Sequence, residues 1–328
     1  MARQEHGVLN RSIAETPIAI FDFETTGLNA GADRVVEVSV VRIEPGKEPQ
    51  LVLDTLVNPN RKMAATEIHG ITDEDVKDAP KFEDVAGNFL RSIYDCVISS
   101  YNIYFDIGFL QYELGRLGFP EIPPHLCLMY MRPLLGLGSR CCLEAACAHH
   151  GFKHPNAHQS AADVLSASKL WPIYLQTIEQ LGLKRFEDLT KLKSYKFLES
   201  LVLEPLKPPA AEKLPSATRL KSRSKKAEQP IAAEVQTVTI KLDALHSYWE
   251  ALKAVLSDLD ISHGEVKYLE KKKKDLAISN EEIRALHARM FGNLISRTVE
   301  DRVLNDKECL TLRSLYRCLG KLGWAPGQ

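Results

Sequence analysis

The chain has 328 residues, of which 45% are hydrophobic and 26% are charged, as in an ordinary soluble globular protein. This composition excludes a wholly disordered, collagen-like or coiled-coil chain, and no stretch reaches the roughly 18 consecutive apolar residues of a membrane span. The formal net charge of −1 conceals an asymmetry: residues 1–204 carry 20 Lys and Arg against 27 Asp and Glu, and residues 205–328 carry 22 against 16.

Residues 1–16 are mixed and polar, which predicts a loose tail without an export signal. Three strands are predicted next, at residues 18–23, 35–43 and 51–57, because these runs are apolar and rich in β-branched side chains. The Gly, Asn, Asp and Pro residues between them favour turns, so we expect a meander.

Helical patterns follow the meander and surround a short buried strand predicted at residues 96–100. They cover residues 82–94, 105–117, 139–150 and about 160–181. Gly118, Gly151 and Gly182 stand where a helix end favours a residue that tolerates positive φ. A chain that begins with strands and continues with a strand among helices is typical of an α/β domain, which we place at residues 17–185.

The second half of the chain differs in composition. A helical appendage is predicted at residues 186–204. Residues 205–234 contain five prolines among Lys, Ser and Ala, and this composition indicates an extended linker. Residues 235–328 predict a smaller all-α domain. Capping-box spacings mark its helix starts at Ser262…Glu265 and Ser279…Glu282, with a looser variant at Asn305…Glu308. The helical domain is expected to bind DNA or a protein partner or to fix an oligomer. The basic excess of residues 205–328 indicates a polyanion partner, although a merely solvated surface explains it equally well.

Two carboxylates end the first predicted strand. Asp22 and Glu24 are two residues apart, so a strand places them on one face. Like charges held close together are costly unless a cation or a proton compensates them. The pair therefore indicates metal binding, or else two solvated acids on an edge strand.

Two further segments carry polar groups at helix starts. Asn102 and Asp106 lie where the fourth strand leads into a helix, and His158 precedes Asp163 at the start of another. Asp106 and Asp163 have ordinary explanations as acids that favour a helix N-terminus, and Asn102 as a turn residue. A neutral His158 is suited to take a proton from water near pH 7.

Taken together, these three segments resemble the DEDDh exonucleases, the 3′→5′ group typified by the proofreading epsilon subunit of bacterial DNA polymerase III. The match rests on Asp22-x-Glu24, Asn102…Asp106 and His158-x4-Asp163 in this order, and the segment from Glu67 to Thr72, with its His-Gly-Ile-Thr, supports it. The resemblance covers about residues 17–182.

The resemblance implies a ribonuclease H-like fold with a mixed, mostly five-stranded sheet, and two divalent cations, Mg²⁺ or Mn²⁺. By the family's pattern Asp22 would bridge both cations, while Glu24 and Asp163 would hold the one that binds the attacking water. Asp106 would serve the second cation, and His158 would be the general base. The chemistry agrees, because hard cations prefer carboxylate oxygens and a pair of them suits phosphodiester hydrolysis.

The resemblance also implies substrate contacts. The backbone of Thr25, Thr26 and Gly27 is expected to approach the terminal nucleotide, with His69 and Asn102 beside the 3′ end. His69 has an alternative explanation as a polar loop residue.

The expected function is a metal-dependent 3′→5′ exonuclease that acts on single-stranded DNA ends in proofreading or repair. One alternative is an RNA-trimming enzyme, because the same catalytic set serves both sugars and the contact that senses the 2′-hydroxyl cannot be located from sequence. Another is a non-catalytic nucleic-acid-binding module. Two positions depart from the family form: Tyr101 stands where family members often have His, and the segment after Cys127 lacks the family's usual residues. Neither departure removes a metal ligand.

Seven cysteines, an odd number in a large chain, fit reduced thiols in the cytosol, so a cytoplasmic protein without a membrane partner is expected. Cysteine and histidine crowd together between residues 141 and 154, but their spacing is not that of a zinc finger or ribbon, and zinc is not expected.

Overall fold

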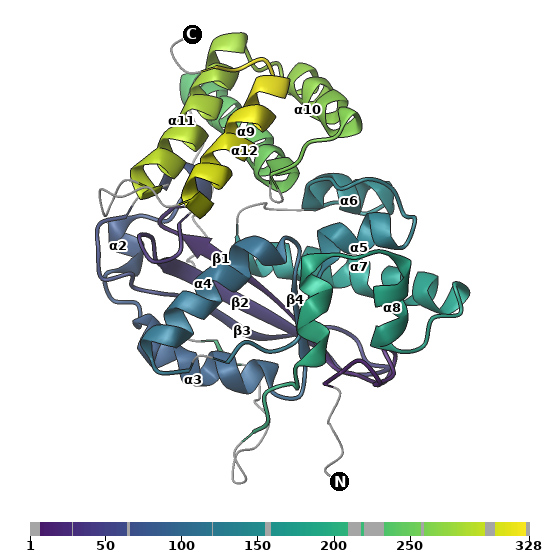
Figure 1. Ribbon diagram of the computed structural model, residues 1–328. Helices are drawn as coiled ribbons and strands as arrows, with labels where there is room; N and C mark the ends of the chain where they lie inside the picture. The colour runs from purple at the N-terminus through teal and green to yellow at the C-terminus, as the bar shows by residue number, and fades with distance from the viewer. Residues whose placement is uncertain are drawn as a thin grey trace. The chain divides into compact units, whose positions relative to one another are not determined.

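The computed structural model describes residues 7–27, 29–63, 66–119, 121–154, 159–208, 218–219, 233–256, 259–298 and 306–325 (Figure 1). The chain divides into two compact units. One, here called the α/β unit, comprises Met1–Gly138 and Leu143–Ser224; the other, the helical unit, comprises Ser139–Cys142 and Lys225–Gln328.

A mixed sheet forms the centre of the α/β unit. Its main strands are β1 (Ile18–Thr25), β2 (Val35–Ile43), β3 (Gln50–Leu56), β4 (Val97–Ser100) and β5 (His125–Cys127). β1, β2 and β3 form the predicted antiparallel meander, whereas β4 pairs parallel with β1, and β5 parallel with β4. The predicted ribonuclease H-like fold, with its mixed five-stranded sheet and flanking helices, is confirmed.

The sheet has one addition that the sequence did not predict. Residues Thr218–Arg219, which we expected inside the linker, form a two-residue strand β6 parallel to β3 at the sheet edge. The order across the sheet is therefore β5-β4-β1-β2-β3-β6.

Helices surround this sheet. They are α1 (Thr66–His69), α2 (Asp73–Val76), α3 (Phe82–Ile93), α4 (Ile103–Arg116), α5 (Leu128–Leu134), α6 (Leu143–His149), α7 (Ser160–Gln180), α8 (Phe186–Leu192) and the 3₁₀ segment η1 (Lys196–Val202). The helix predicted from residue 139 begins only at Leu143, and α1, α2 and α5 were not predicted. Gly151 and Gly182, just after α6 and α7, have the expected positive φ of 82° and 73°.

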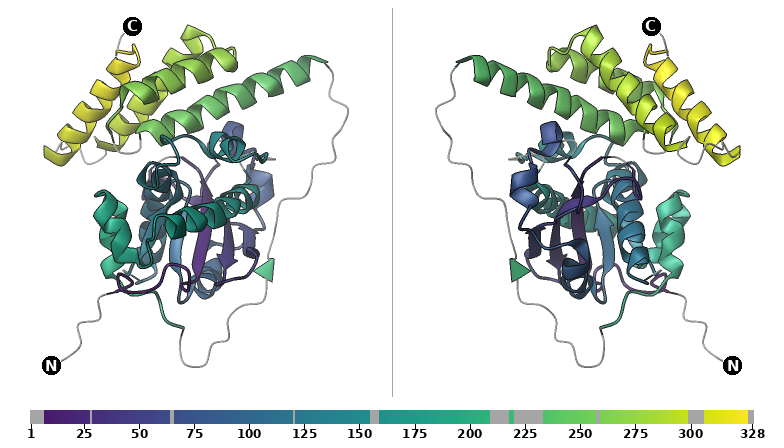
Figure 2. Two further views of the ribbon diagram at one scale, coloured as in Figure 1. Left: turned by 90° about the vertical axis from the view of Figure 1, so that its right-hand side faces the viewer. Right: turned by 90° about the vertical axis from the view of Figure 1, so that its left-hand side faces the viewer.

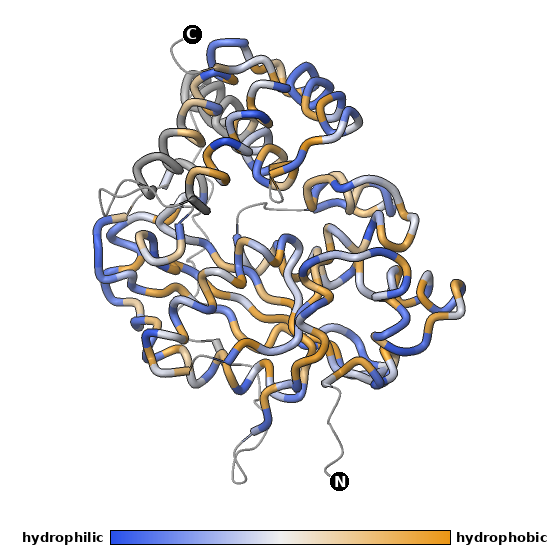
Figure 3. The backbone as a smooth tube through the Cα atoms, in the orientation of Figure 1, coloured by the Kyte–Doolittle hydropathy of each residue, from blue (hydrophilic) through white to orange (hydrophobic). Residues whose placement is uncertain are grey.

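The alternation of β1 assigns its two faces. Phe21 and Phe23 point to the face covered by α3, where the Phe21 and Phe89 rings lie 5.6 Å apart and the Phe23 and Phe89 rings 5.8 Å apart. The polar positions between them face the other side, across which α7 runs (Figure 2). β2 is buried at every position, because helices cover both of its faces. The apolar residues accordingly gather along the central strands (Figure 3).

The helical unit contains α9 (Ala233–Leu256), α10 (His263–Asp275), α11 (Asn280–Thr298) and α12 (Asp306–Lys321). Two of the predicted capping boxes are present: Glu265 N–H donates to Ser262 Oγ, and Glu282 N–H to Ser279 Oγ. Asn305, the third predicted cap, lies outside the described residues. No helix in the described part of the chain combines the length and apolar composition needed to cross a membrane.

Candidate active site

Strand β1 supplies two acids of the site. Asp22 and Glu24 lie on the face opposite Phe21 and Phe23, and both are partly exposed. Asp22 is paired with Ser39 of β2 and Glu24 with Glu37, and the register then shifts in a bulge between Glu24 and Thr25. Bulges bend a strand and redirect its side chains, so the acids stand where regular pairing ends.

Helix α7 supplies the third acid from its first turn, and buried side chains of β2 hold the start of this helix. The Ser160 amide donates to Glu37 Oε2 at 3.1 Å, and the Ser160 and Ser39 hydroxyl oxygens lie 2.7 Å apart. Ser39 also donates to Asp54 Oδ1 at 3.0 Å. Because Ser160 is fixed to the sheet in this way, Asp163, one turn later, is held beside β1.

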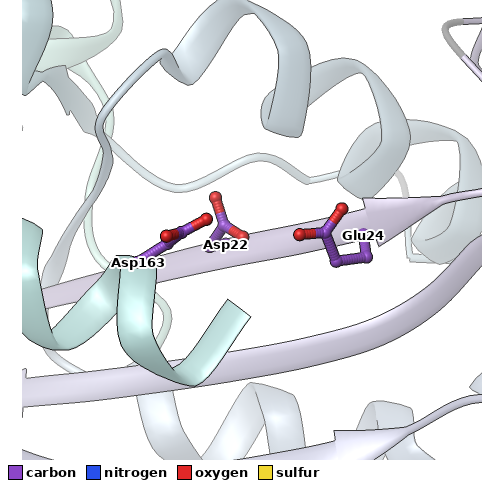
Figure 4. Close-up of side chains that lie close together, drawn as sticks. All are labelled: Asp22, Glu24 and Asp163. Carbon is purple, nitrogen blue, oxygen red and sulfur yellow. The ribbon is translucent and has the colours of Figure 1, made fainter. Parts of the chain in front are cut away.

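The three acids come together. One carboxylate oxygen from each of Asp22, Glu24 and Asp163 lies within 4.8 Å of the other two, and Figure 4 shows Asp163 reaching from α7 toward β1. Such a set of oxygen donors matches the ligands that Mg²⁺ and Mn²⁺ prefer. In the described part of the chain, no other cluster of three His, Cys, Asp or Glu side chains gathers its ligand atoms in this way.

Asp106, the fourth predicted acid, is placed differently. It is buried in the first turn of α4, where Oδ1 accepts the Phe23 amide at 3.1 Å and Oδ2 accepts the Ser100 hydroxyl. Phe23 stands between Asp22 and Glu24, so Asp106 is bonded to the backbone that carries both acids. It is adjacent to the cluster but not one of the three converging side chains.

The other two predicted polar residues of these segments have separate outcomes. Asn102 caps α4 through its backbone, with its carbonyl accepting the Phe105 amide at 3.0 Å. Its Oδ1 is buried and has no hydrogen-bond partner among the described residues. His158 lies outside the described residues.

The loop after β1 is held by Asp33. Thr26 Oγ1 donates to Asp33 Oδ1 at 3.1 Å, and Thr26 Oγ1 in turn accepts the Arg34 amide at 3.1 Å. A Cβ atom on Gly27 would lie 2.4 Å from the Asp33 carboxylate, so a larger residue there would displace Asp33 from its bond to Thr26. Thr25 closes the turn by donating to the Gly27 carbonyl at 2.5 Å.

His69 is buried at the end of α1. Its Nδ1 accepts the Ile71 amide at 3.0 Å, which assigns this nitrogen as the unprotonated one and places the ring proton on Nε2. The residue thus helps to shape its own turn, as the alternative explanation from the sequence allowed.

The sequence did not identify the residues that support Asp163. Glu37 and Ser39 are hidden in an apolar strand, and their partners are distant in the chain. The only available signal was the presence of these two polar side chains in a strand whose other residues are mostly apolar and buried. A second support is His154, whose Nε2 lies 2.8 Å from Asp163 Oδ1.

Comparisons with known proteins point in one direction. Residues 19–171 match the family model RNase_T, described as Exonuclease. The chain is 32% identical over 144 residues to the DNA polymerase III PolC-type of Bacillus subtilis, which covers 37% of this chain and 10% of that protein. It is 30% identical over 187 residues to the DNA polymerase III subunit epsilon-like protein of Rhodobacter capsulatus, which covers 53% of this chain and 27% of that protein.

Among solved structures, exonuclease I superposes with a TM-score of 0.39 at 18% identity, covering 56% of this chain and 42% of that one. The chain spans only a minor part of the length of the two polymerase III relatives named above.

Proposed function

We propose, from the premise that this chain carries a DEDDh exonuclease domain of the DNA polymerase III epsilon type, that it removes nucleotides from the 3′ ends of single-stranded DNA in proofreading or repair. The observation that carries the proposal is the convergence of Asp22, Glu24 and Asp163, with ligand atoms within 4.8 Å of one another.

The donor set fits divalent cations. Three carboxylates so close together repel one another unless cations or protons compensate them, and oxygen ligands suit Mg²⁺ and Mn²⁺. We propose that Asp22, Glu24 and Asp163 hold two such cations together with Asp106, which the resemblance assigns to the second. When bound, the cations lower the pKa of the attacking water and stabilise the charge on the phosphate and the leaving oxygen.

The chain's own side chains would move the proton and align the ligands. In this proposal His158 takes the proton from the attacking water, which is the role that the resemblance assigns to it. Asp106 has a second effect, because its bond to the Phe23 amide keeps Asp22 and Glu24 at fixed positions on β1.

The substrate contacts remain those predicted from the resemblance. Thr25, Thr26 and Gly27 would present backbone to the terminal nucleotide, and His69 would lie near the 3′ end. Asn102 has an acceptor that is buried without a partner among the described residues, which supports a contact with a bound group. A DNA or protein partner of residues 235–328 stays a prediction.

Digestion of a 5′-end-labelled single-stranded DNA oligonucleotide tests the proposal, with Mg²⁺, Mn²⁺ or EDTA added. We expect a ladder of shortened labelled products with either cation and none with EDTA. Asp22→Asn should abolish the ladder, whereas Asp78→Asn, an exposed acid of the same unit, should leave it unchanged.

Three outcomes would contradict parts of the proposal. Release of the label as a mononucleotide would reverse the polarity. Faster digestion of an RNA of the same sequence would favour the RNA-trimming enzyme. Binding of the oligonucleotide without any product, with or without EDTA, would favour the non-catalytic module.

A further inference from the structure

A short segment after α6 lies along α7 beside the acidic cluster. Lys169 Nζ of α7 stands 5.9 Å from the centre of the Phe152 ring, and His154 reaches both Ser166 and Asp163. Asp163, Ser166 and Lys169 are three residues apart in turn, so they share one face of the helix. Residues 152–154 therefore follow this face toward the site.

His154 is the point of this segment that touches the cluster. Its side chain is only 4% exposed, with Nε2 2.8 Å from Asp163 Oδ1 and Nδ1 2.8 Å from the Ser166 oxygen. Ser166 is itself buried. Both ring nitrogens thus face side chains of α7, one turn of the helix apart.

The Ser166 contact fixes the orientation of the His154 ring. A serine hydroxyl can donate to Nδ1 or accept from it, and either bond holds the ring with Nε2 facing Asp163. In this arrangement the edge of the ring packs against the carboxylate, with Nε2 2.8 Å from Asp163 Oδ1 but without the geometry of a hydrogen bond. The imidazole restricts rotation of the Asp163 side chain and leaves its second oxygen to other ligands.

We propose that His154, aligned by Ser166, is a positioning residue that holds the Asp163 carboxylate ready to bind a divalent cation. The inference rests on the proposed function, because it assumes that Asp163 is a metal ligand. Groups that orient metal ligands typically change metal affinity by about 10–100-fold when removed. His154 acts through Asp163 and touches neither the substrate nor the reacting atoms.

Binding of Mn²⁺ to the full chain without nucleic acid tests this role directly, measured by electron paramagnetic resonance of the free ion. We expect His154→Ala to weaken Mn²⁺ binding by about tenfold or more. His154→Gln should retain most of the affinity, because a glutamine side chain can fill nearly the same space against Asp163. Ser166→Ala should lie between the two, since it removes only the alignment of the ring.

The control is His149→Ala, which removes an exposed imidazole on α6 and should leave Mn²⁺ binding unchanged. Melting curves without metal identify any variant that is misfolded. If His154→Ala is misfolded, the Mn²⁺ affinity of Ser166→Ala, the smallest of these changes, tests the inference instead. A parallel titration of exonuclease activity with Mn²⁺ should show the loss for His154→Ala restored at saturating metal.

Two results would overturn the inference while leaving the proposed function intact. One is wild-type Mn²⁺ affinity in folded His154→Ala. The other is normal Mn²⁺ binding with lost turnover at saturating metal in both His154 variants, which would make His154 a proton-transfer group. Failure of the wild-type chain itself to bind Mn²⁺ would contradict both proposals at once.

Discussion

The α/β unit and the helical unit bury polar side chains in different ways. In the α/β unit, Glu37, Ser39 and Ser160 connect a central strand to the start of α7 through buried hydrogen bonds. In the helical unit, Glu265 serves the start of its own helix and is also paired with Arg140, and the Tyr248 hydroxyl lies 3.3 Å from His287 Nε2.

This difference indicates where the chemistry is concentrated. Connections between distant elements are costly to bury, and in the α/β unit they end beside a group of acids that lies partly open to solvent. In the helical unit the buried polar groups hold a helix start, an ion pair between Glu265 and Arg140 and a contact between two helices, and among the described residues they end at no such group of acids. We therefore expect substitutions in the buried network beneath α7 to affect catalysis, and substitutions of the buried polar groups in the helical unit to affect stability alone.

The largest effect is expected from Asp163→Asn. Loss of one metal ligand should lower the initial rate of DNA digestion by roughly a thousandfold, because several kcal/mol of charge stabilisation disappear. Ligands of one site act as a unit, so adding Asp22→Asn should reduce the rate little further. Glu281→Gln, an exposed acid of the helical unit, is the control and should keep full activity. A multiplicative loss in the double variant would show that the two acids act separately.

The second effect concerns acid stability of the helical unit. Burial, with a smaller contribution from the Lys273 charge, lowers the pKa of His287 from 6.5 to about 4. Between these values the unfolded chain binds a proton that the folded unit does not, so stability is full above pH 6.5 and falls as the pH drops toward 4. The loss approaches roughly 3 kcal/mol.

Hydrogen exchange at pH 7, 5.5 and 4.5 measures this loss separately for peptides of each unit. Burial also lowers the pKa of His125 in the α/β unit, so His287→Leu provides the discriminating comparison. The variant should flatten the pH dependence of the helical peptides alone. An unchanged pH dependence in His287→Leu would exclude His287 as the source of the acid sensitivity.

The third effect returns to the connection beneath α7. Glu37→Ala removes the acceptor of the Ser160 amide, and leaving this buried group unsatisfied should cost about 1–3 kcal/mol in the free energy of unfolding. Urea denaturation measures the cost, and activity should fall as Asp163 loses its fixed position. Glu37→Gln retains an acceptor and should lose less. Glu48→Ala, an exposed acid before β3, is the control. Wild-type stability in Glu37→Ala would mean that the network does not hold α7.

The sequence predicted the geometry of β1 well, because local rules place the residues of a strand. Alternation along β1 puts Asp22 and Glu24 on one face whatever else the chain does. The three-strand meander and the start of α7 at Ser160 followed likewise from composition and turn signals. The convergence of Asp163 with the β1 acids came from the resemblance and not from any local pattern.

The supports of Asp163 could not be predicted for a physical reason. Glu37 in β2 and Ser160 in α7 meet only after the chain has folded, and neither carries a local signal of its partner. His154 stood in a group of Cys and His residues that suggested only a question about zinc. The helix α5 was missed as well, because it follows directly from a three-residue strand and contains Pro133.

The smallest effect is expected at the start of α10 and tests the comparison from the helical side. Ser262→Ala removes the hydroxyl that accepts the Glu265 amide, which should cost about 1 kcal/mol in the stability of the helical unit. Ser279→Ala makes the same change at the exposed start of α11 and should cost no more. Denaturation followed by hydrogen exchange in the α10 peptides reports the loss. The rate of oligonucleotide digestion should stay at the wild-type value in both variants, and a fall in that rate without unfolding would mean that the helical unit takes part in catalysis.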